Sequence, residues 1–269
     1  MNWKPRASSL GYYFSCDFRA AFDRAVAEGL LPAAEDEPKP YADLGTLIHW
    51  QLMNDMGLKF PNGKEPPTPD MVTSAATLYR GNESALMDNV ASVAALAKGH
   101  VPPPPKDAEW WAETHYEGPD HTGTIDFIAS DGSVIGDLKT TSRKPTHNKV
   151  KAPHLYQILA YKVLAELNGA DVERGWILYA GSRADWALCV EFKLNTPEIR
   201  ALTKYLKSYA TYLRGPELFT RAVPRLGTHC EDEFCPHRHR CRDKVLPKAG
   251  DLDDAVAPVS TTTVPEAFT

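Results

Sequence analysis

The chain has 269 residues and a formal net charge of −5, and 43 % of its residues are hydrophobic and 24 % charged. These values are ordinary for a globular protein with ample length for a core, and they give no sign of nucleic-acid binding by bulk positive charge. The sequence also excludes a membrane protein, because no apolar run reaches the length of a membrane span. Because the N-terminus lacks the apolar core of a signal peptide, we expect a cytoplasmic protein.

The first predicted element is a helix over residues 10–28. Ser8 and Ser9 are suitable caps for its N-terminus, and Gly29 marks its end. Cys16 lies in the aromatic stripe of this helix, where a cysteine is ordinarily a small buried hydrophobe.

A second amphipathic helix is predicted over residues 44–56, capped by Asp43 and ending at Gly57. His49 lies beside its apolar face, where a lone histidine is usually structural. The sequence then predicts two scaffold helices, over residues 70–79 and 83–98. A strand over residues 108–116 follows, and its Glu113 is by itself an ordinary solvated edge carboxylate.

The stretch HTGTIDFIASDGSVIGDLKT predicts a hairpin, with strands over residues 124–128 and 134–139 joined by the turn sequence Ser-Asp-Gly-Ser. Side chains alternate between the faces of a strand, so Asp137 and Lys139 share one face, and an ordinary register brings Asp126 beside them. Two neighbouring carboxylates repel unless a cation or a shared proton intervenes. The hairpin therefore predicts a hard-metal site with a lysine beside it, the alternative being a surface hairpin whose charges face water.

A helix over residues 154–167 follows a basic loop, and its Gln157 and Tyr161 are four residues apart and so share a face. Taken alone, this is an amphipathic helix with a polar residue at its margin. The chain then predicts a second hairpin, with strands over residues 176–180 and 187–192, and a helix over residues 196–213.

Three cysteines fall within twelve residues, at Cys230, Cys235 and Cys241. In an intracellular chain such a cluster indicates metal or iron–sulfur ligation. Cys16 would complete the four thiolates that an iron–sulfur cluster takes, whereas zinc is the alternative, with His229, His237 or His239 as further ligands. Cys189 is interpreted as a packed thiol, and residues 248–269 as a disordered tail.

Taken in order, these motifs resemble the PD-(D/E)xK nuclease superfamily, and within it the RecB-like exonucleases of AddB-type helicase–nucleases and CRISPR-associated nucleases. The resemblance spans residues 8–241 and rests on Cys16, G-x-x-x-H ending at His49, Glu113, G-x-I-D ending at Asp126, D-x-K from Asp137 to Lys139, Q-x-x-x-Y from Gln157 to Tyr161, and the cysteine cluster. The sequence departs from the family at Asp17, where proline is usual, and in the four residues between Cys230 and Cys235, where two are usual.

The resemblance implies an α/β fold, a restriction-endonuclease-like core with a mixed central sheet flanked by helices. It implies one domain over residues 1–247, with a helical part over 1–100, a catalytic core over 107–195, and a C-terminal helix and cysteine cluster over 196–247. The implied function is that of a metal-dependent DNA nuclease, an exonuclease acting on DNA ends in recombination, repair or replication. The alternatives are an endonuclease of the same fold and a catalytically silent DNA-binding or scaffold subunit. Besides DNA, a helicase or recombination protein is an implied partner.

The resemblance also implies roles for individual residues. Mg²⁺ or Mn²⁺ would be held by His49, Asp126, Asp137 and the backbone carbonyl of Leu138. Lys139 would orient the attacking water or stabilise developing charge, Glu113 would lie close to the metal, and Gln157 and Tyr161 would shape the site or hold the substrate backbone. A 4Fe–4S cluster, or alternatively Zn²⁺, would be held by Cys16, Cys230, Cys235 and Cys241.

Overall fold

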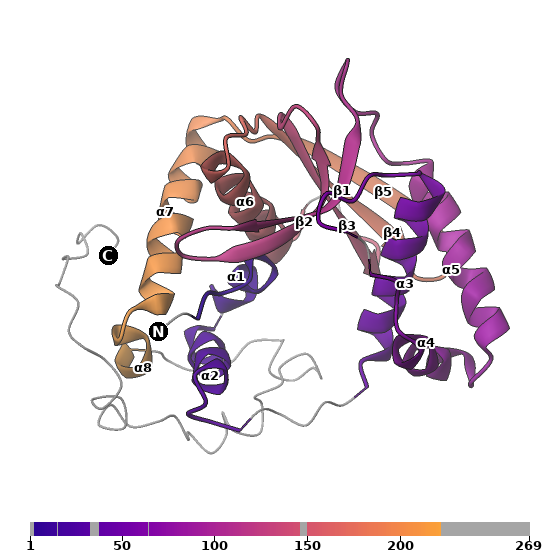
Figure 1. The fold of residues 1–269 in the computed structure, drawn as a ribbon, viewed down its shortest axis with the longest axis horizontal. Coiled ribbons are helices and arrows are strands. Elements are labelled where there is room, and N and C mark those ends of the chain that lie inside the picture. Colours follow the sequence, from indigo (N-terminus) through magenta and orange to yellow (C-terminus); the bar gives the residue numbers. More distant parts are fainter. Residues whose placement is uncertain (1–2, 15, 33–37, 64, 146–149, 222–269) are drawn as a thin grey trace.

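A five-stranded mixed sheet lies at the centre of the molecule (Figure 1). The structure is a computed structural model, and it describes residues 3–14, 16–32, 38–63, 65–145 and 150–221. The strands, adjacent in chain order, are β1 (Trp110–Glu117), β2 (Thr122–Ala129), β3 (Val134–Thr141), β4 (Arg174–Gly181) and β5 (Ala187–Lys193). All neighbours pair antiparallel except β3 and β4, which are parallel and connected by helix α6 (Ala152–Leu167). The predicted α/β class with a mixed sheet flanked by helices is confirmed.

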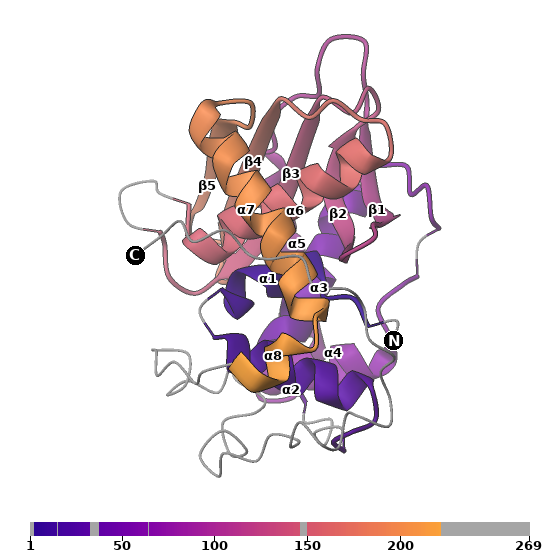
Figure 2. The same ribbon diagram turned by 90° about the vertical axis from the view of Figure 1, so that its left-hand side faces the viewer.

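Helices cover both faces of the sheet, and each face has its own hydrophobic core. One core contains α6 and the N- and C-terminal helices: α1 (Ala7–Tyr13), α2 (Asp17–Ala27), α7 (Pro197–Arg214) and α8 (Glu217–Arg221). The other contains α3 (Pro40–Asp55), α4 (Pro69–Ala76) and α5 (Glu83–Lys98), with a 3₁₀ turn, η1 (Thr77–Tyr79), between the last two. Figure 2 shows α7 lying outside α6. No helix within the described ranges has the length and apolar character needed to cross a membrane.

The predicted helix over residues 10–28 is wrong as a single element, because the structure divides it into α1 and α2. Cys16 is extended between them, with φ −159° and ψ 96°. Contacts with α7 accompany the break: the ring of Phe14 stacks on that of Tyr209 at a centroid distance of 4.2 Å, and the Tyr209 hydroxyl lies 2.7 Å from the Tyr13 carbonyl oxygen and 2.5 Å from the Asp17 carboxylate. The Tyr13 carbonyl oxygen also accepts the Cys16 N–H at 2.9 Å, so a tight turn ends α1 at the point where α7 packs against it.

The predicted caps of the first two long helices are also wrong. The first helix begins at Ala7, ahead of the serines, because Arg6 forms an isolated bridge with Thr122 and so fixes extended backbone just before it. α3 begins at Pro40, and proline is favoured in the first turn because its fixed φ suits a helix. Asp43 consequently lies inside the first turn of α3, where its charge complements the helix dipole.

The N- and C-terminal helices meet through buried contacts of Arg24. Its guanidinium donates to the Gly215 carbonyl oxygen at 2.7 Å and lies over the Phe219 ring at 5.0 Å. Cys16 is buried nearby in a small cluster with Phe18 and Phe22. The cysteines at positions 230, 235 and 241, and the tail from residue 248, lie outside the described residues.

Gly136, between Ile135 and Asp137 on β3, provides space for the buried ring of Trp176 on β4. A Cβ atom at Gly136 would lie 2.1 Å from two ring carbons of Trp176, which is only 1 % exposed. We expect Gly136→Ala to lower the free energy of unfolding by about 1–3 kcal/mol, the usual cost of overpacking a core. Thermal or urea unfolding would measure it.

Gly45→Ala is the matched control, because a Cβ there meets nothing within 4 Å and the position is helical. It should be neutral or stabilising by up to about 1 kcal/mol. Equal stability of Gly136→Ala and the wild type would contradict the packing argument.

Candidate active site

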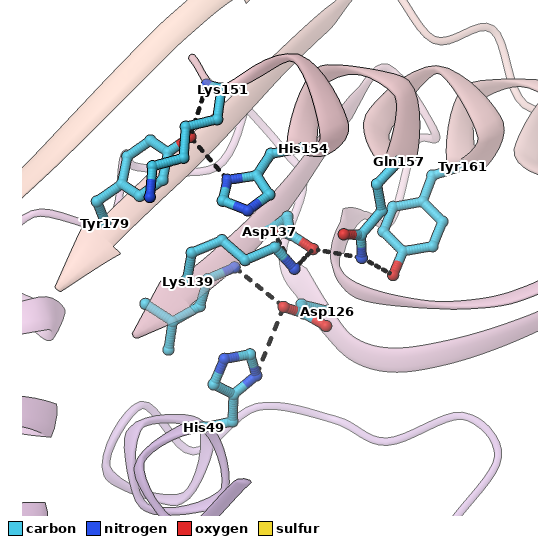
Figure 3. Close-up of polar contacts among 10 residues, drawn as sticks. His49, Asp126, Asp137, Lys139, Lys151, His154, Gln157, Tyr161 and Tyr179 are labelled. Atoms are coloured by element: carbon cyan, nitrogen blue, oxygen red, sulfur yellow. Dashed lines mark hydrogen bonds and ion pairs between the residues drawn. The ribbon is translucent and has the colours of Figure 1, made fainter. Parts of the chain in front are cut away.

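The residues of the predicted hairpin converge where β2 and β3 leave their regular pairing. The register pairs Phe127 with Gly136 and Ile128 with Ile135, so the next positions along the strands are Asp126 and Asp137. There the Leu138 N–H donates to the Asp126 side chain at 2.9 Å. The Asp126 carboxylate thus accepts a backbone hydrogen bond from the neighbouring strand, which fixes it beside Asp137 (Figure 3).

Asp137 is the most enclosed group of the site, with its residue fully buried. Its Oδ1 accepts hydrogen bonds from Lys139 Nζ and from Gln157 Nε2, both at 3.0 Å. Its Oδ2 lies 2.9 Å from Lys139 Nζ, a close ion pair whose geometry is not that of a hydrogen bond, and accepts none from the described residues. The predicted sharing of one strand face by Asp137 and Lys139 is therefore seen as direct contact.

Burial raises the pKa of both carboxyl groups to about 6, against the opposing effect of the Lys139 charge. The Asp126 charge raises the pKa of Asp137 further. Burial lowers the pKa of Lys139, but the charges of Asp137 and Asp126 outweigh it, so this pKa is raised overall. The lysine is therefore a firmly held cation at neutral pH.

His49 reaches the site from α3, on the other side of the sheet from α6. Its Nδ1 lies 3.5 Å from Asp126 Oδ2. Burial and the Lys139 charge lower the pKa of His49 to about 4, so the imidazole is neutral at neutral pH. A neutral imidazole has a lone pair available for a metal, which a protonated one lacks.

Glu113 lies at an irregular point of β1, where its φ is +46° and the flanking residues Ala112 and Thr114 pair with Phe127 and Ile125. Its half-buried carboxylate raises the pKa of both Asp126 and His49. The flanking pairs set Glu113 opposite Asp126 in the β1–β2 register, which favours the site interpretation over that of a solvated edge carboxylate.

Gln157 and Tyr161 lie on the face of α6 that contacts β3. Besides its bond to Asp137, Gln157 Nε2 donates to the Tyr161 hydroxyl at 2.6 Å. Both residues are buried, at 5 % and 3 % exposed, so in this arrangement they orient Asp137. This geometry favours a role in shaping the site over contact with a substrate backbone.

The donor chemistry of these residues fits a hard divalent cation, for which carboxylate oxygens are the preferred ligands. The buried Asp137 Oδ2, without a hydrogen bond from the described residues, is a position that a cation would satisfy. As they lie, however, no three His, Cys, Asp or Glu side chains of the described ranges form a ready metal site. The Lys139 ammonium and the Leu138 N–H instead balance the two carboxylates.

Three residues near the site were missed by sequence reasoning. His154 and Tyr179 form a hydrogen-bonded pair next to Lys139, and Tyr12 of α1 is close enough to Lys139 to raise its pKa. A signal for His154 was present, because His154, Gln157 and Tyr161 follow the i, i+3, i+7 spacing of one helical face. The sequence carries no such signal for Tyr179 or Tyr12. The β3–β4 register places Tyr179 beside Lys139, and the packing of α1 places Tyr12 near it.

Comparison with protein-family models agrees with the ordered motifs. The family model described as the PD-(D/E)XK nuclease superfamily matches residues 7–242. No curated protein gives a significant match. Among solved structures, that of a protein designated SSO0001 is 18 % identical with a TM-score of 0.35 and covers 75 % of this chain and 96 % of its own. A phage-related exonuclease from Haemophilus somnus is 12 % identical with a TM-score of 0.35, covering 79 % of this chain and 94 % of its own.

Proposed function

The chain belongs to the PD-(D/E)XK nuclease superfamily, and from this premise we propose that it is a metal-dependent nuclease that hydrolyses phosphodiester bonds in DNA. The observation that carries the proposal is the buried Asp137–Lys139 ion pair with Asp126 beside it, held by the N–H of the intervening Leu138. Two carboxylates with a purely structural role would not stabilise the fold by being buried, because burial removes solvation from their charged forms and raises their pKa values. Such strained ionisation is typical of a catalytic centre.

His49, Asp126, Asp137 and the Leu138 carbonyl would hold Mg²⁺ or Mn²⁺. A bound divalent cation supplies the activation of a water molecule and offsets negative charge on the scissile phosphate. Burial of Asp126 and Asp137 raises their pKa values because it disfavours the ionised forms. The positive charge of a bound cation would offset this cost, so the same burial favours binding of a cation at the site.

Lys139 supplies a fixed positive charge to this chemistry. Its raised pKa rules it out as a neutral base near pH 7, so its part is to stabilise charge that develops on the phosphate or to orient the water. Gln157 fixes the Asp137 carboxylate from behind, and Tyr161 fixes Gln157 in turn. Glu113 adds a third carboxylate at the edge of the same site.

The finer assignments rest on the resemblance in sequence. We propose an exonuclease that acts on DNA ends in recombination, repair or replication, with a helicase or recombination protein as partner. We further propose a 4Fe–4S cluster on Cys16, Cys230, Cys235 and Cys241, with zinc as the alternative. The packing of α2 against the end of α7 and α8 through Arg24 supports this pairing of the two ends of the chain, because it places α8, the last described helix before the three C-terminal cysteines in the sequence, beside the helix that follows Cys16.

The proposal is tested with end-labelled single-stranded and double-stranded DNA in Mg²⁺, in Mn²⁺ and in EDTA. We expect cleavage in either metal and none in EDTA, with mononucleotides or short fragments released progressively from an end. Cleavage of closed circular DNA would instead favour the endonuclease alternative. Metal-independent DNA binding without any cleavage would favour the silent subunit, and absence of both binding and cleavage would contradict the proposal altogether.

A further inference from the structure

His154 and Tyr179 form a polar pair next to the Asp137–Lys139 pair, and the chemistry described above does not use it. His154 lies in the first turn of α6 and is half-buried, one helical turn before Gln157. Tyr179 is the direct neighbour of Lys139 in the parallel β3–β4 register and is fully buried. In Figure 3, His154 lies between Tyr179 and the Asp137–Lys139 pair, on the side of α6 from which Gln157 projects.

The hydrogen bonds of Tyr179 determine which ring nitrogen of His154 carries the proton. The Tyr179 hydroxyl oxygen accepts the Lys151 N–H at 3.2 Å and lies 2.9 Å from His154 Nδ1. A phenol has a single proton, and no other acceptor for it is found among the described residues, so it is donated to Nδ1. Nδ1 is then an acceptor, and the proton of the neutral ring is on Nε2.

The surroundings keep this imidazole neutral. Burial, then the charges of Lys139 and Lys151, lower the pKa of His154 to about 3. Its place in the first turn of α6 acts in the same direction, because the positive end of the helix dipole disfavours a further positive charge. His154 is thus a fixed hydrogen-bond donor, and it is unable to act as a base because its only lone pair is taken by Tyr179.

We propose that the His154 Nε2–H donates a hydrogen bond to a phosphate oxygen of the nucleic-acid substrate, beside the phosphodiester that Lys139 faces. No described residue accepts a hydrogen bond from Nε2. Lys139 and Lys151 on either side give the position a positive potential that attracts an anion, and an N–H donor bonds strongly to a charged oxygen. This inference rests on the proposed function, which makes a phosphodiester the ligand.

The tautomer is tested without substrate. In the ¹⁵N spectrum of histidine-labelled protein, we expect His154 as the neutral Nε2–H form, and Tyr179→Phe should convert it to a mixture of tautomers because the donor to Nδ1 is lost. An Nδ1–H form in the wild type would overturn the proposal, since Nε2 would then have no proton to donate.

Binding is tested by fluorescence anisotropy with a short labelled single-stranded oligonucleotide and its duplex, in EDTA so that no cleavage occurs. His154→Ala should weaken binding of at least one of these probes roughly 10- to 100-fold, the range for a hydrogen bond to a charged group. The slope of log K against log salt should stay unchanged, because a neutral donor releases no counterion. His154→Gln, whose amide nitrogen reaches close to the Nε2 position, should recover much of the affinity.

His100→Ala is the matched control, since His100 is an exposed histidine just after α5 whose Nδ1 hydrogen-bonds to the Leu96 carbonyl oxygen of that helix. Wild-type affinity in a folded His154→Ala protein, a reduced salt slope, or a wild type that binds neither probe would overturn the proposal. If DNA binding depends on His154 but the protein never cleaves DNA, the phosphate contact of His154 is supported and the proposed nuclease activity is contradicted. If His154→Ala cleaves DNA with unchanged KM and kcat, the nuclease activity is supported and the phosphate contact is contradicted.

Discussion

Lys139→Ala should lower the rate of DNA cleavage roughly 100- to 1000-fold while the protein stays folded, the usual loss when one group that stabilises transition-state charge is removed. The Lys139 ammonium is placed by Asp137, at 2.9 and 3.0 Å from its two carboxylate oxygens. Because the charges of Asp137 and Asp126 raise its pKa, the group is cationic over the whole neutral range. Single-turnover cleavage of end-labelled DNA measures the chemical step directly.

Asp126→Ala and Asp137→Ala should have larger effects and reduce cleavage to background, because each removes a proposed metal ligand together with a partner of Lys139. Lys139→Arg should not recover activity, since the planar guanidinium does not reproduce the compact point charge held between two oxygens. Lys193→Ala provides the matched control, being an exposed lysine at the end of β5. Undiminished cleavage by purified, folded Asp137→Ala would exclude this site as the catalytic centre.

The hairpin and its charged face were predictable from the sequence because a strand has a strict two-residue period. Once Asp137 and Lys139 are placed on one strand, their contact follows from side-chain alternation and needs no tertiary information. The same holds for Gln157 and Tyr161, which a helical period places together. The role of Gln157 did not follow from that period, because it depends on α6 returning over β3.

The features that the sequence did not predict are those decided by contacts between distant segments. The break between α1 and α2 depends on Phe14 and Tyr209, which are almost two hundred residues apart. Helical periodicity is continuous through this point, so local pattern favoured one helix and tertiary packing determined two. The His154–Tyr179 bond likewise requires both the parallel β3–β4 register and the position at which α6 begins.

Asp137→Asn should stabilise the metal-free protein at neutral pH, by on the order of 2 kcal/mol. The folded protein raises the pKa of this carboxyl to about 6, mainly through burial, whereas an unfolded aspartate has a pKa near 3.9. The ionised form present at pH 7 is thus the less favoured one in the fold, and each unit of difference corresponds to about 1.4 kcal/mol. Asparagine resembles the protonated carboxyl in being uncharged, and its carbonyl oxygen remains able to accept the Gln157 amide.

The directions of the pKa shifts determine how the stability of the metal-free protein changes with pH. Between about pH 4 and pH 6, the folded state binds more protons at Asp137 than the unfolded state does, so the contribution of this group to stability falls as the pH rises through that window. His49 acts oppositely, since its lowered pKa makes stability fall as the pH drops from about 6.5 towards 4. The variant retains His49 and Asp126, so subtracting its unfolding free energy from that of the wild type leaves the share of Asp137 together with its electrostatic coupling to these two groups.

Thermal and urea unfolding of the wild type and Asp137→Asn at pH 4.5 and pH 7.5, with and without Mn²⁺, would measure how the stability difference depends on pH and on metal. Without metal, the advantage of Asp137→Asn should be present at pH 7.5 and small at pH 4.5. Mn²⁺ should stabilise the wild type much more than the variant, because a ligand raises stability only through its affinity for the folded state. Asp88→Asn, at an exposed position of α5, should change neither result. A large loss of metal-free stability in Asp137→Asn would mean that the ion pair with Lys139 holds the fold together, and that the strain attributed to this buried carboxylate is absent.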